Sequence, residues 1–171
     1  MRVSVLTVSD RSSRGEREDK SGPLLNELIQ AQGWDLIQYQ IVSDQQSDIE
    51  EILCDWVDSG NVNLILTTGG TGFSPRDQAP EATLSVVERL VPGIAEAMRS
   101  QSLKITPHAM LSRAVAGIRG RTLIVNLPGS PKAAKENFEI ILPALPHAIQ
   151  LLTDDPSAEA SHYPGPPKKH I

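Results

Sequence analysis

The sequence predicts an α/β protein built on a mostly parallel sheet. Over residues 2–68, short β-rich apolar runs alternate with amphipathic segments at helical spacing. Strands that alternate with helices pair in parallel through right-handed crossovers, which is the first reason for this fold class. The second reason is a cluster of glycines at the end of the third apolar run, because open parallel sheets bind their ligands at such strand ends.

The first strand is expected at Arg2–Ser9, where valine and leucine dominate. A polar loop follows it, and in an open parallel sheet such loops face the ligand. Ser9 and Asp10, at the strand end itself, are therefore candidate binding residues. The charged run Glu16–Lys20 is equally compatible with a solvated loop, and both interpretations stay open.

Two helices and a second strand are expected next. Ser21 should cap a helix that ends at Gly33. In residues 34–43 apolar and polar side chains alternate, which predicts a strand with one wetter face at an edge of the sheet. Residues 47–50 have the spacing of a capping box, and the apolar stripe that follows predicts a helix closed by Gly60.

The third strand, Val62–Thr68, should lie beside the first, because the wetter second strand belongs at an edge. With that order the chain reverses its direction across the sheet between the first and third strands, which creates a crevice at their carboxyl ends. Ser9, Asp10 and Asp44 follow strands on this side. We therefore expect these three residues around the crevice.

The loop Thr67–Gly72, which reads Thr-Thr-Gly-Gly-Thr-Gly, is the predicted anion site. Its glycines permit positive φ and let backbone N–H groups approach a phosphate closely. A P-loop is excluded because no lysine occurs between Asn61 and Lys104, and a dinucleotide fingerprint is excluded because Pro75 stands where Gly or Ala is needed. A plain tight turn stays an alternative.

Arg76 and Asp77 favour the phosphate interpretation. They offer a cation for phosphate and a carboxylate for magnesium between the glycine loop and the helix that Pro80 opens. A second loop of the same kind follows a later strand, where Ser130 is expected to cap a helix. Its residues are Asn126, Leu127, Pro128, Gly129, Ser130 and Pro131.

The rest of the chain predicts shorter elements. They are expected in this order: a helix over 81–91, its continuation through Met98 after a break at Pro92-Gly93, a short helix from Thr106 to Leu111, strands at 115–118 and 122–127 that turn at Gly120, and helices ending at Leu152. In the 81–91 helix the side chains expected to face inward are Leu84, Val87, Leu90 and Val91.

Composition narrows the class of protein. The 171 residues, 39% hydrophobic and 22% charged, fit about one globular domain over 1–153, followed by a proline-rich extended tail over 154–171. A net charge of -5 argues against nucleic acid as a partner. The single Cys54 excludes a disulfide framework and fits a reducing compartment. We see no leader and no apolar run of membrane length, so we expect a cytoplasmic protein without a membrane partner.

Taken together, the motifs resemble one known family. The stretches that carry the likeness are Thr67–Gly72, Arg76-Asp77, Pro80-Glu81-Ala82, Met110–Arg113 and Asn126–Pro131. They are similar to those of the molybdopterin-binding family of molybdenum cofactor biosynthesis, of the MogA and MoaB type, and the likeness extends from Arg2 to about Leu152. The combination is far more specific than any one piece.

The resemblance implies a fold, an activity and partners. The fold would be a three-layer sandwich with helices on both faces of the sheet, and the assembly a homotrimer. The activity would be that of a molybdopterin adenylyltransferase, which uses ATP and Mg²⁺ to make adenylylated molybdopterin and pyrophosphate. The product would then pass to a molybdenum insertion protein.

Position by position, the resemblance also implies site residues. The family's two functional aspartates fall on Asp44 and Asp77, which would be catalytic and hold magnesium. The substrate-binding residues would be Ser9, Asp10, Thr68, Gly69, Gly70, Thr71, Gly72, Arg76, Ser112, Asn126, Pro128, Gly129 and Ser130. One departure is Ala79, where the family often has Thr, which removes a helix cap worth about 1 kcal/mol.

The chemistry agrees with the residues available. Molybdopterin carries a phosphate whose oxygen can attack without a side-chain nucleophile, and none is evident in the sequence. Two alternatives stay open. The chain could be a non-catalytic molybdopterin-binding or scaffold protein of the same family, or a nucleotide-dependent enzyme that acts on another pterin.

Overall fold

The computed structural model describes residues 1–156 and 158. Within this part of the chain, six strands form one sheet in the order β2-β1-β3-β6-β5-β4. The strands are β1 (Arg2–Val8), β2 (Asp35–Val42), β3 (Leu64–Thr68), β4 (Arg89–Leu90), β5 (Ala116–Arg119) and β6 (Thr122–Leu127). β2, β1, β3 and β6 run parallel, whereas β5 pairs antiparallel with β6 and β4 pairs antiparallel with β5. The prediction of a mostly parallel sheet is confirmed.

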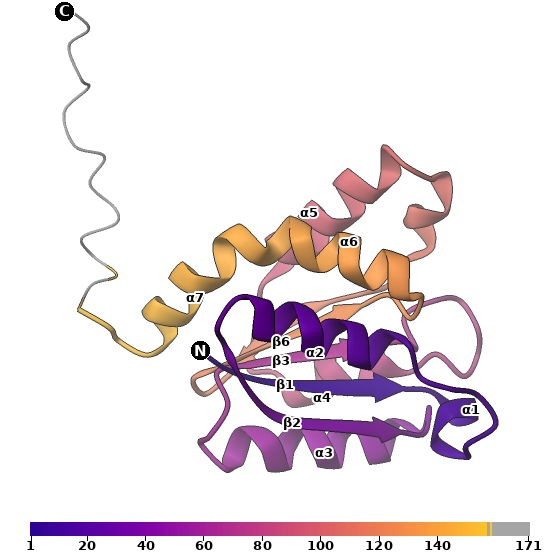
Figure 1. Cartoon of the computed structure of the whole chain (residues 1–171), viewed down its shortest axis with the longest axis horizontal. Coiled ribbons are helices and arrows are strands. Elements are labelled where there is room, and N and C mark those ends of the chain that lie inside the picture. Colours follow the sequence, from indigo (N-terminus) through magenta and orange to yellow (C-terminus); the bar gives the residue numbers. More distant parts are fainter. Residues whose placement is uncertain (157, 159–171) are drawn as a thin grey trace, which may run out of the picture.

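Helices cover both faces of the sheet (Figure 1). The α-helices are α1 (Asp10–Ser13), α2 (Ser21–Ala31), α3 (Gln46–Asp58), α4 (Ala79–Val86), α5 (Pro92–Leu103), α6 (Pro131–Ile141) and α7 (Leu145–Leu152), and the 3-10 helices are η1 (Pro107–Leu111) and η2 (Leu142–Ala144). One apolar cluster, with Leu25 and Phe138, joins the sheet to α2, α5, α6 and α7. The other, with Leu53 and Trp56, joins it to α3 and α4. The three-layer arrangement is therefore confirmed.

The register of the parallel strands brings their carboxyl ends into one row. Val8 of β1 pairs with Val42 of β2, and Thr68 of β3 pairs with Leu127 of β6. The loops after these strands consequently emerge at the same edge of the sheet, where α1 lies at the tips of β1 and β2 (Figure 1). The predicted order, with β2 at the edge and β1 beside β3, is confirmed.

Two helices begin differently from the prediction. Ser21 is the first residue of α2 and not its cap, and Lys20 at the cap position makes no side-chain cap hydrogen bond. Instead, Oδ1 of Asp19 accepts hydrogen bonds from the backbone N–H groups of Ser21 and Gly22 at 2.9 and 3.2 Å. The predicted capping box at 47–50 is not formed, since α3 already begins at Gln46. Residues 10–13, expected in a loop, form the single turn of α1, which Ser9 caps.

The segment 81–91 departs most from the prediction. The helix α4 ends at Val86, Val87 is extended, and Arg89–Leu90 form the short strand β4. Leu84 and Leu90, expected inside, are 45% and 59% exposed. The physical reason is pairing with β5, because the N–H groups of Glu88 and Val91 donate to carbonyl oxygens of that strand.

The elements after β4 agree with the sequence. Thr106 caps η1 and Ser130 caps α6 through their side chains, and β5 and β6 form the expected hairpin around Gly120. The predicted tail 154–171 falls mostly outside the described residues. Within the residues that are described, no helix is both long and apolar enough to cross a bilayer.

Candidate functional site

The crevice at the carboxyl ends of β1 and β3 holds a cavity of about 450 Å³. Its walls come from the loops after β1, β2, β3 and β6 and from the amino end of α2. The lining residues are Thr7, Val8, Ser9, Ser12, Arg17, Glu18, Asp19, Lys20, Ser21, Asp44, Thr68, Gly69, Gly70, Asp77, Gly129, Ser130 and Pro131. Eight of the residues expected to bind substrate or metal are among them. These are Ser9, Asp44, Thr68, Gly69, Gly70, Asp77, Gly129 and Ser130.

Asp44 carries a carboxylate in an unfavourable electrostatic position. Burial raises its pKa, and the nearby carboxylates of Asp10 and Asp77 raise it further, against a hydrogen bond from the backbone N–H of Asp10 that lowers it. In Asp10 the pKa is lowered instead, first by the hydrogen bond from the backbone N–H of Asp44 and also by Arg76. A cation placed beside Asp44 would relieve its charge.

Asp77 is fixed at the start of the segment that leads into α4. Its Oδ2 accepts the backbone N–H of Ser74 at 2.9 Å, while its own N–H donates to the carbonyl oxygen of Ser74 at 2.9 Å. A Cβ at Gly72 would lie 2.9 Å from the same carboxylate oxygen. The absence of a side chain at Gly72 therefore leaves room for the carboxylate of Asp77.

The glycine loop presents free backbone donors. Gly69 and Gly70 have positive φ, 99° and 62°, which glycine adopts without strain. The N–H of Gly69 is used, because it donates to the carbonyl oxygen of Leu127 at 3.2 Å. Within the described part of the chain, the N–H groups of Gly70, Thr71 and Gly72 have no intramolecular acceptor. Three adjacent amides are thus available to an anion.

Two arginines hold the loop that follows the glycines. Arg76 forms an ion pair with Asp10, which joins this loop to the end of β1. Arg113 binds it from the other side: its Nε donates to the carbonyl oxygen of Gly72 at 2.7 Å, and its Nη2 donates to the carbonyl oxygen of Asp77 at 2.5 Å. Arg113 also pairs with Glu81 in α4. Arg113 therefore ties both ends of the loop to the segment before β5, whereas Arg76 ties the loop to Asp10.

Asn126, which is expected to bind substrate, lines neither the first cavity nor the second cavity described below. It is fully buried, and its side-chain amide donates to the hydroxyls of Thr67 and Thr83 at 2.9 and 2.8 Å. Its Oδ1 accepts the N–H of Val115 at 3.2 Å. The residue instead fastens β6 to β3, α4 and the segment before β5.

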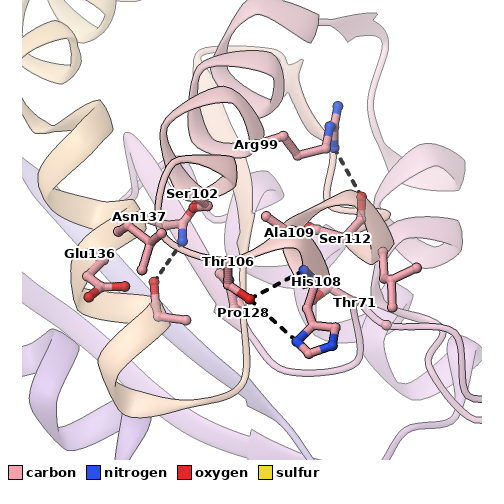
Figure 2. Close-up of a pocket in the computed structure, with 14 residues that line it drawn as sticks. Thr71, Arg99, Ser102, Thr106, His108, Ala109, Ser112, Pro128, Glu136 and Asn137 are labelled. Atoms are coloured by element: carbon pink, nitrogen blue, oxygen red, sulfur yellow. Dashed lines mark hydrogen bonds between the residues drawn. The ribbon is translucent and has the colours of Figure 1, made fainter.

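A second cavity, of about 280 Å³, lies on the other side of the glycine loop (Figure 2). Its lining residues are Thr71, Gly72, Arg99, Ser102, Ile105, Thr106, His108, Ala109, Leu111, Ser112, Pro128, Ala133, Glu136 and Asn137. Four residues from the resemblance line it, namely Thr71, Gly72, Ser112 and Pro128. The first and second cavities thus meet along the glycine loop and the Pro128-Gly129 turn.

The second cavity combines apolar walls with fixed polar groups. Arg99 donates to the carbonyl oxygen of Ala114 at 2.8 Å, and the amide of Asn137 donates to the carbonyl oxygen of Ala133 at 2.8 Å. The hydroxyl of Ser102 donates to Oδ1 of Asn137 at 3.4 Å (Figure 2). Such walls suit a flat heterocycle with hydrogen-bonding edges.

Sequence reasoning missed several of these residues. Ser102 and Asn137 lie on α5 and α6, and only tertiary packing brings the two helices together. Arg113 was part of a recognised motif, but nothing in its neighbourhood indicated that it binds the glycine loop. Asp19, which lines the first cavity, could have been found from its place two residues before a helix start, which favours a capping residue.

The described residues contain no cluster of three or more His, Cys, Asp or Glu side chains that could hold a metal alone. Asp44 and Asp77 are the two expected metal ligands that line the first cavity. Mg²⁺ commonly takes one or two carboxylates together with substrate phosphates. The arrangement can therefore receive phosphate groups on backbone amides and a divalent cation at the two aspartates.

Comparison with known proteins gives one consistent result. The family model described as "Probable molybdopterin binding domain" matches residues 4–147. Molybdopterin adenylyltransferase of Helicobacter pylori (strain J99) is 43% identical over 152 residues, which cover 88% of this chain and 86% of the relative. Gephyrin of Dictyostelium discoideum is 47% identical over 166 residues, covering 91% of this chain but only 23% of gephyrin.

The fold agrees with a solved relative as well. The crystal structure of the molybdopterin biosynthesis enzyme MoaB from Thermus thermophilus is 50% identical and superposes with a TM-score of 0.85. The match covers 91% of this chain and 98% of that protein. The two chains therefore share the fold over nearly their whole length.

Proposed function

The chain belongs to the molybdopterin-binding domain family, and from this premise we propose that it is a molybdopterin adenylyltransferase of molybdenum cofactor biosynthesis. It joins molybdopterin to AMP from ATP and releases pyrophosphate. The observation that carries the proposal is the pair of cavities that meet at one loop with free amides, because the reaction must bring two phosphate compounds together. Relatives of similar length that bear this enzyme name support it.

The two cavities suit the two substrates. The second cavity, with its apolar walls and fixed polar edges at Ser102 and Asn137, is the place for the pterin. The first cavity, with Asp44 and Asp77, is the place for the nucleotide. The phosphate of molybdopterin then lies at the glycine loop, where the two cavities meet.

The backbone supplies the main donors to the reacting phosphates. The free N–H groups of Gly70, Thr71 and Gly72 lie between the cavities. They neutralise negative charge without bringing a further titratable group into the site. The amino end of helix α6, which Ser130 caps, lines the first cavity. The dipole of the helix favours an anion there.

The residues fit Mg²⁺ that arrives with ATP. The pKa of Asp44 is raised by burial and by the neighbouring carboxylates, so a cation at this position would remove an existing electrostatic cost. Asp44 and Asp77 are the residues that would hold it. Bound there, Mg²⁺ would neutralise phosphate charge and align the two reacting groups.

The step itself is a phosphoryl-group substitution. An oxygen of the molybdopterin phosphate forms a bond to the α-phosphorus of ATP, and the bond from that phosphorus to the α,β-bridging oxygen breaks. The attacking oxygen is ionised near neutral pH, so no side chain has to remove a proton. The protein contributes position, through Asp77 and the glycine loop, and charge, through backbone amides and Arg76.

One experiment separates the proposal from its two alternatives. The purified chain is incubated with molybdopterin, ATP and Mg²⁺, and adenylylated molybdopterin and pyrophosphate are measured. Formation of both products is expected. Tight binding of molybdopterin without turnover would favour the scaffold protein, and turnover only with a different phosphorylated pterin would favour the third alternative.

The family resemblance also suggests an oligomeric state and a cellular location. We propose a homotrimer, for which the exposed apolar side chains of Phe73, Leu90 and Met110 offer contact surface, and light scattering is the direct test. A stable monomer would contradict it. The single Cys54 supports a cytoplasmic enzyme. Its product would be passed to a protein that inserts molybdenum.

A further inference from the structure

The segment Arg14–Lys20, here called the strap, forms one wall of the first cavity. It leaves α1, turns back on it through hydrogen bonds from the N–H groups of Glu16 and Arg17 to the carbonyl oxygen of Arg11, and then enters α2. Arg17, Asp19 and Lys20 of the strap line the cavity. From sequence alone this charged run was equally compatible with a solvated loop.

Asp19 fastens the strap to three elements at once. Its Oδ2 accepts the hydroxyl of Thr7 in β1 at 2.5 Å and the hydroxyl of Tyr39 in β2 at 2.7 Å. Its Oδ1 accepts from the N–H and hydroxyl of Ser21 and from the N–H of Gly22. A Cβ at Gly22 would collide with this group of side chains. The end of the strap is therefore held closely against the sheet.

These hydrogen bonds also set the charge of Asp19. Burial acts to raise its pKa, but the hydrogen bonds from Thr7, Tyr39, Gly22 and Ser21 outweigh burial, and the pKa is lowered. Asp19 is therefore an anion at neutral pH whose carboxylate is satisfied by hydrogen bonds from neutral groups of the protein. It anchors the strap without forming an ion pair with Arg17 or Lys20.

Arg17 and Lys20 are the only cationic side chains among the described residues that line this cavity. The guanidinium of Arg17 has no hydrogen bond or ion pair within the part of the chain that the structure describes. Lys20 has only a pair with Glu18 at 3.7 Å, where both side chains are more than 70% exposed, so the pair contributes little. Arg14, on the same strap, is instead engaged by Glu16 and does not line the cavity.

The first cavity carries more negative than positive side chains, so a triphosphate could bind there only with the help of cations such as Arg17 and Lys20. Four carboxylates line it, those of Glu18, Asp19, Asp44 and Asp77, against the two cations of the strap. Magnesium on the aspartates would offset part of this charge. The β- and γ-phosphates need further positive groups, because like charges close together are strongly unfavourable.

The strap also lies on the side of the site where the leaving pyrophosphate is expected. It lines the first cavity only, whereas the glycine loop and the Pro128-Gly129 turn border both cavities. In phosphoryl transfer the attacking and leaving oxygens are roughly in line. If the attacking phosphate comes from the second cavity, the leaving pyrophosphate extends away from it, within the first.

We propose that Arg17 and Lys20 bind the β- and γ-phosphates of the nucleotide, and that Asp19 is a positioning residue which holds the strap for this contact. The inference rests on the proposed function and names the groups that receive its leaving group. When the bond to the α,β-bridging oxygen breaks, its electron pair stays on the departing pyrophosphate. Arg17 and Lys20 stabilise the charge that develops there.

The test is equilibrium binding, by calorimetry with Mg²⁺ present, of three probes: ATP, AMP and inorganic pyrophosphate. Arg17→Gln and Lys20→Gln should each lower the affinity for ATP and for pyrophosphate by about tenfold. This is the effect expected from the loss of one charge-assisted hydrogen bond. Affinity for AMP should stay within about twofold, because AMP lacks the phosphates concerned. Arg14→Gln is the matched control on the same strap and should leave all three affinities unchanged.

Asp19→Asn tests the positioning role. The amide keeps the size of the side chain but can no longer accept on both sides, so the strap should loosen. We expect weaker ATP and pyrophosphate binding with unchanged AMP binding, and a higher KM for ATP with an unchanged KM for molybdopterin. A residue needed only for folding would lower the affinity for all probes together.

The outcomes also separate this inference from the proposed function. Equal losses of affinity for ATP and AMP in the Arg17 or Lys20 variants would overturn the inference. The same losses of affinity in Arg14→Gln would also overturn it. So would a double variant, with both Arg17 and Lys20 changed to Gln, that binds pyrophosphate as tightly as the wild type. If the wild-type chain makes no adenylylated molybdopterin but pyrophosphate binding still depends on these two residues, the proposed function fails and the inference stands.

Discussion

Asp10 and Asp44 exchange hydrogen bonds across the crevice. The backbone N–H of Asp10 donates to Oδ2 of Asp44 at 2.9 Å, and the backbone N–H of Asp44 donates to Oδ1 of Asp10 at 3.0 Å. The exchange ties the loop after β1 to the loop after β2. It also holds two carboxylates near each other, and of the two it is Asp44 whose pKa is raised.

Asp44→Asn should therefore cost activity and gain stability. An amide oxygen still accepts the N–H of Asp10, while the half-buried charge disappears. We expect adenylyl transfer to fall by about tenfold to a thousandfold and the unfolding temperature at pH 7 to rise by a few degrees. Turnover assays and thermal unfolding of the same preparation measure both.

The pH dependence of that gain has a definite sign. Because the folded state holds the Asp44 proton more tightly than the unfolded state, the contribution of Asp44 to stability is lost as pH rises above about 3.9, the ordinary pKa of Asp, toward the raised folded value. Below that pH the wild-type and Asp44→Asn proteins should unfold at nearly the same temperature. A variant that is less stable than wild type at pH 7 would contradict this account.

Gly72→Ala should impair Asp77 without disturbing the fold. The new Cβ would lie 2.9 Å from a carboxylate oxygen of Asp77, and a side-chain end can move away at little cost. We expect a turnover loss of at least about tenfold, as for removal of a positioned charge, with the unfolding temperature almost unchanged. Gly93→Ala is the control, since nothing lies within 4 Å of its added Cβ, and equal turnover in the two variants would refute the explanation.

Gly70→Ala should lower both stability and affinity for the phosphorylated pterin. Its φ is +62°, and the new Cβ would lie 3.1 Å from Val8 and 3.3 Å from Ala79. Gly33→Ala has the same kind of φ, +69°, but open space around it, so both variants should lose about 1 kcal/mol to backbone strain. Gly70→Ala should lose more than that and bind molybdopterin less tightly. Unchanged binding would leave the glycine loop as a structural turn.

Asn126→Ala should destabilise the chain strongly. The variant would leave the hydroxyls of Thr67 and Thr83 and the N–H of Val115 without their partner, and each buried unpaired group costs about 1–3 kcal/mol. Denaturant unfolding should show a loss of at least about 2 kcal/mol. The exposed Asn61, changed to Ala, is the control, and a similar small loss in both variants would assign Asn126 back to the substrate.

The sequence predicted the strand order well because its signals are local. The wetter pattern of residues 34–43 placed β2 at the edge, and the crevice followed from that order. Its failure at residues 87–91 has a non-local cause. The β-branched Val87 and Val91 suit a strand as well as a helix, and the partner strand β5, which decides between the two, comes later in the chain.

For the site, the sequence located residues but could not assign what each one touches. Asn126 stands next to a ligand loop in sequence, yet its partners Thr67 and Thr83 turn it inward. Ser102 and Asn137 had no signal at all, because their meeting depends on the packing of α5 against α6. Backbone proximity can be predicted from strand ends, whereas the direction of a side chain depends on distant partners.

The wall shared by the two cavities has a kinetic consequence. A product that joins pterin to adenylate occupies both cavities at once, so each half raises the effective concentration of the other at its own subsite. The product should then leave more slowly than either substrate, and its departure would limit turnover. If the proposed function holds, the chain would keep its product bound across the two cavities after the chemical step.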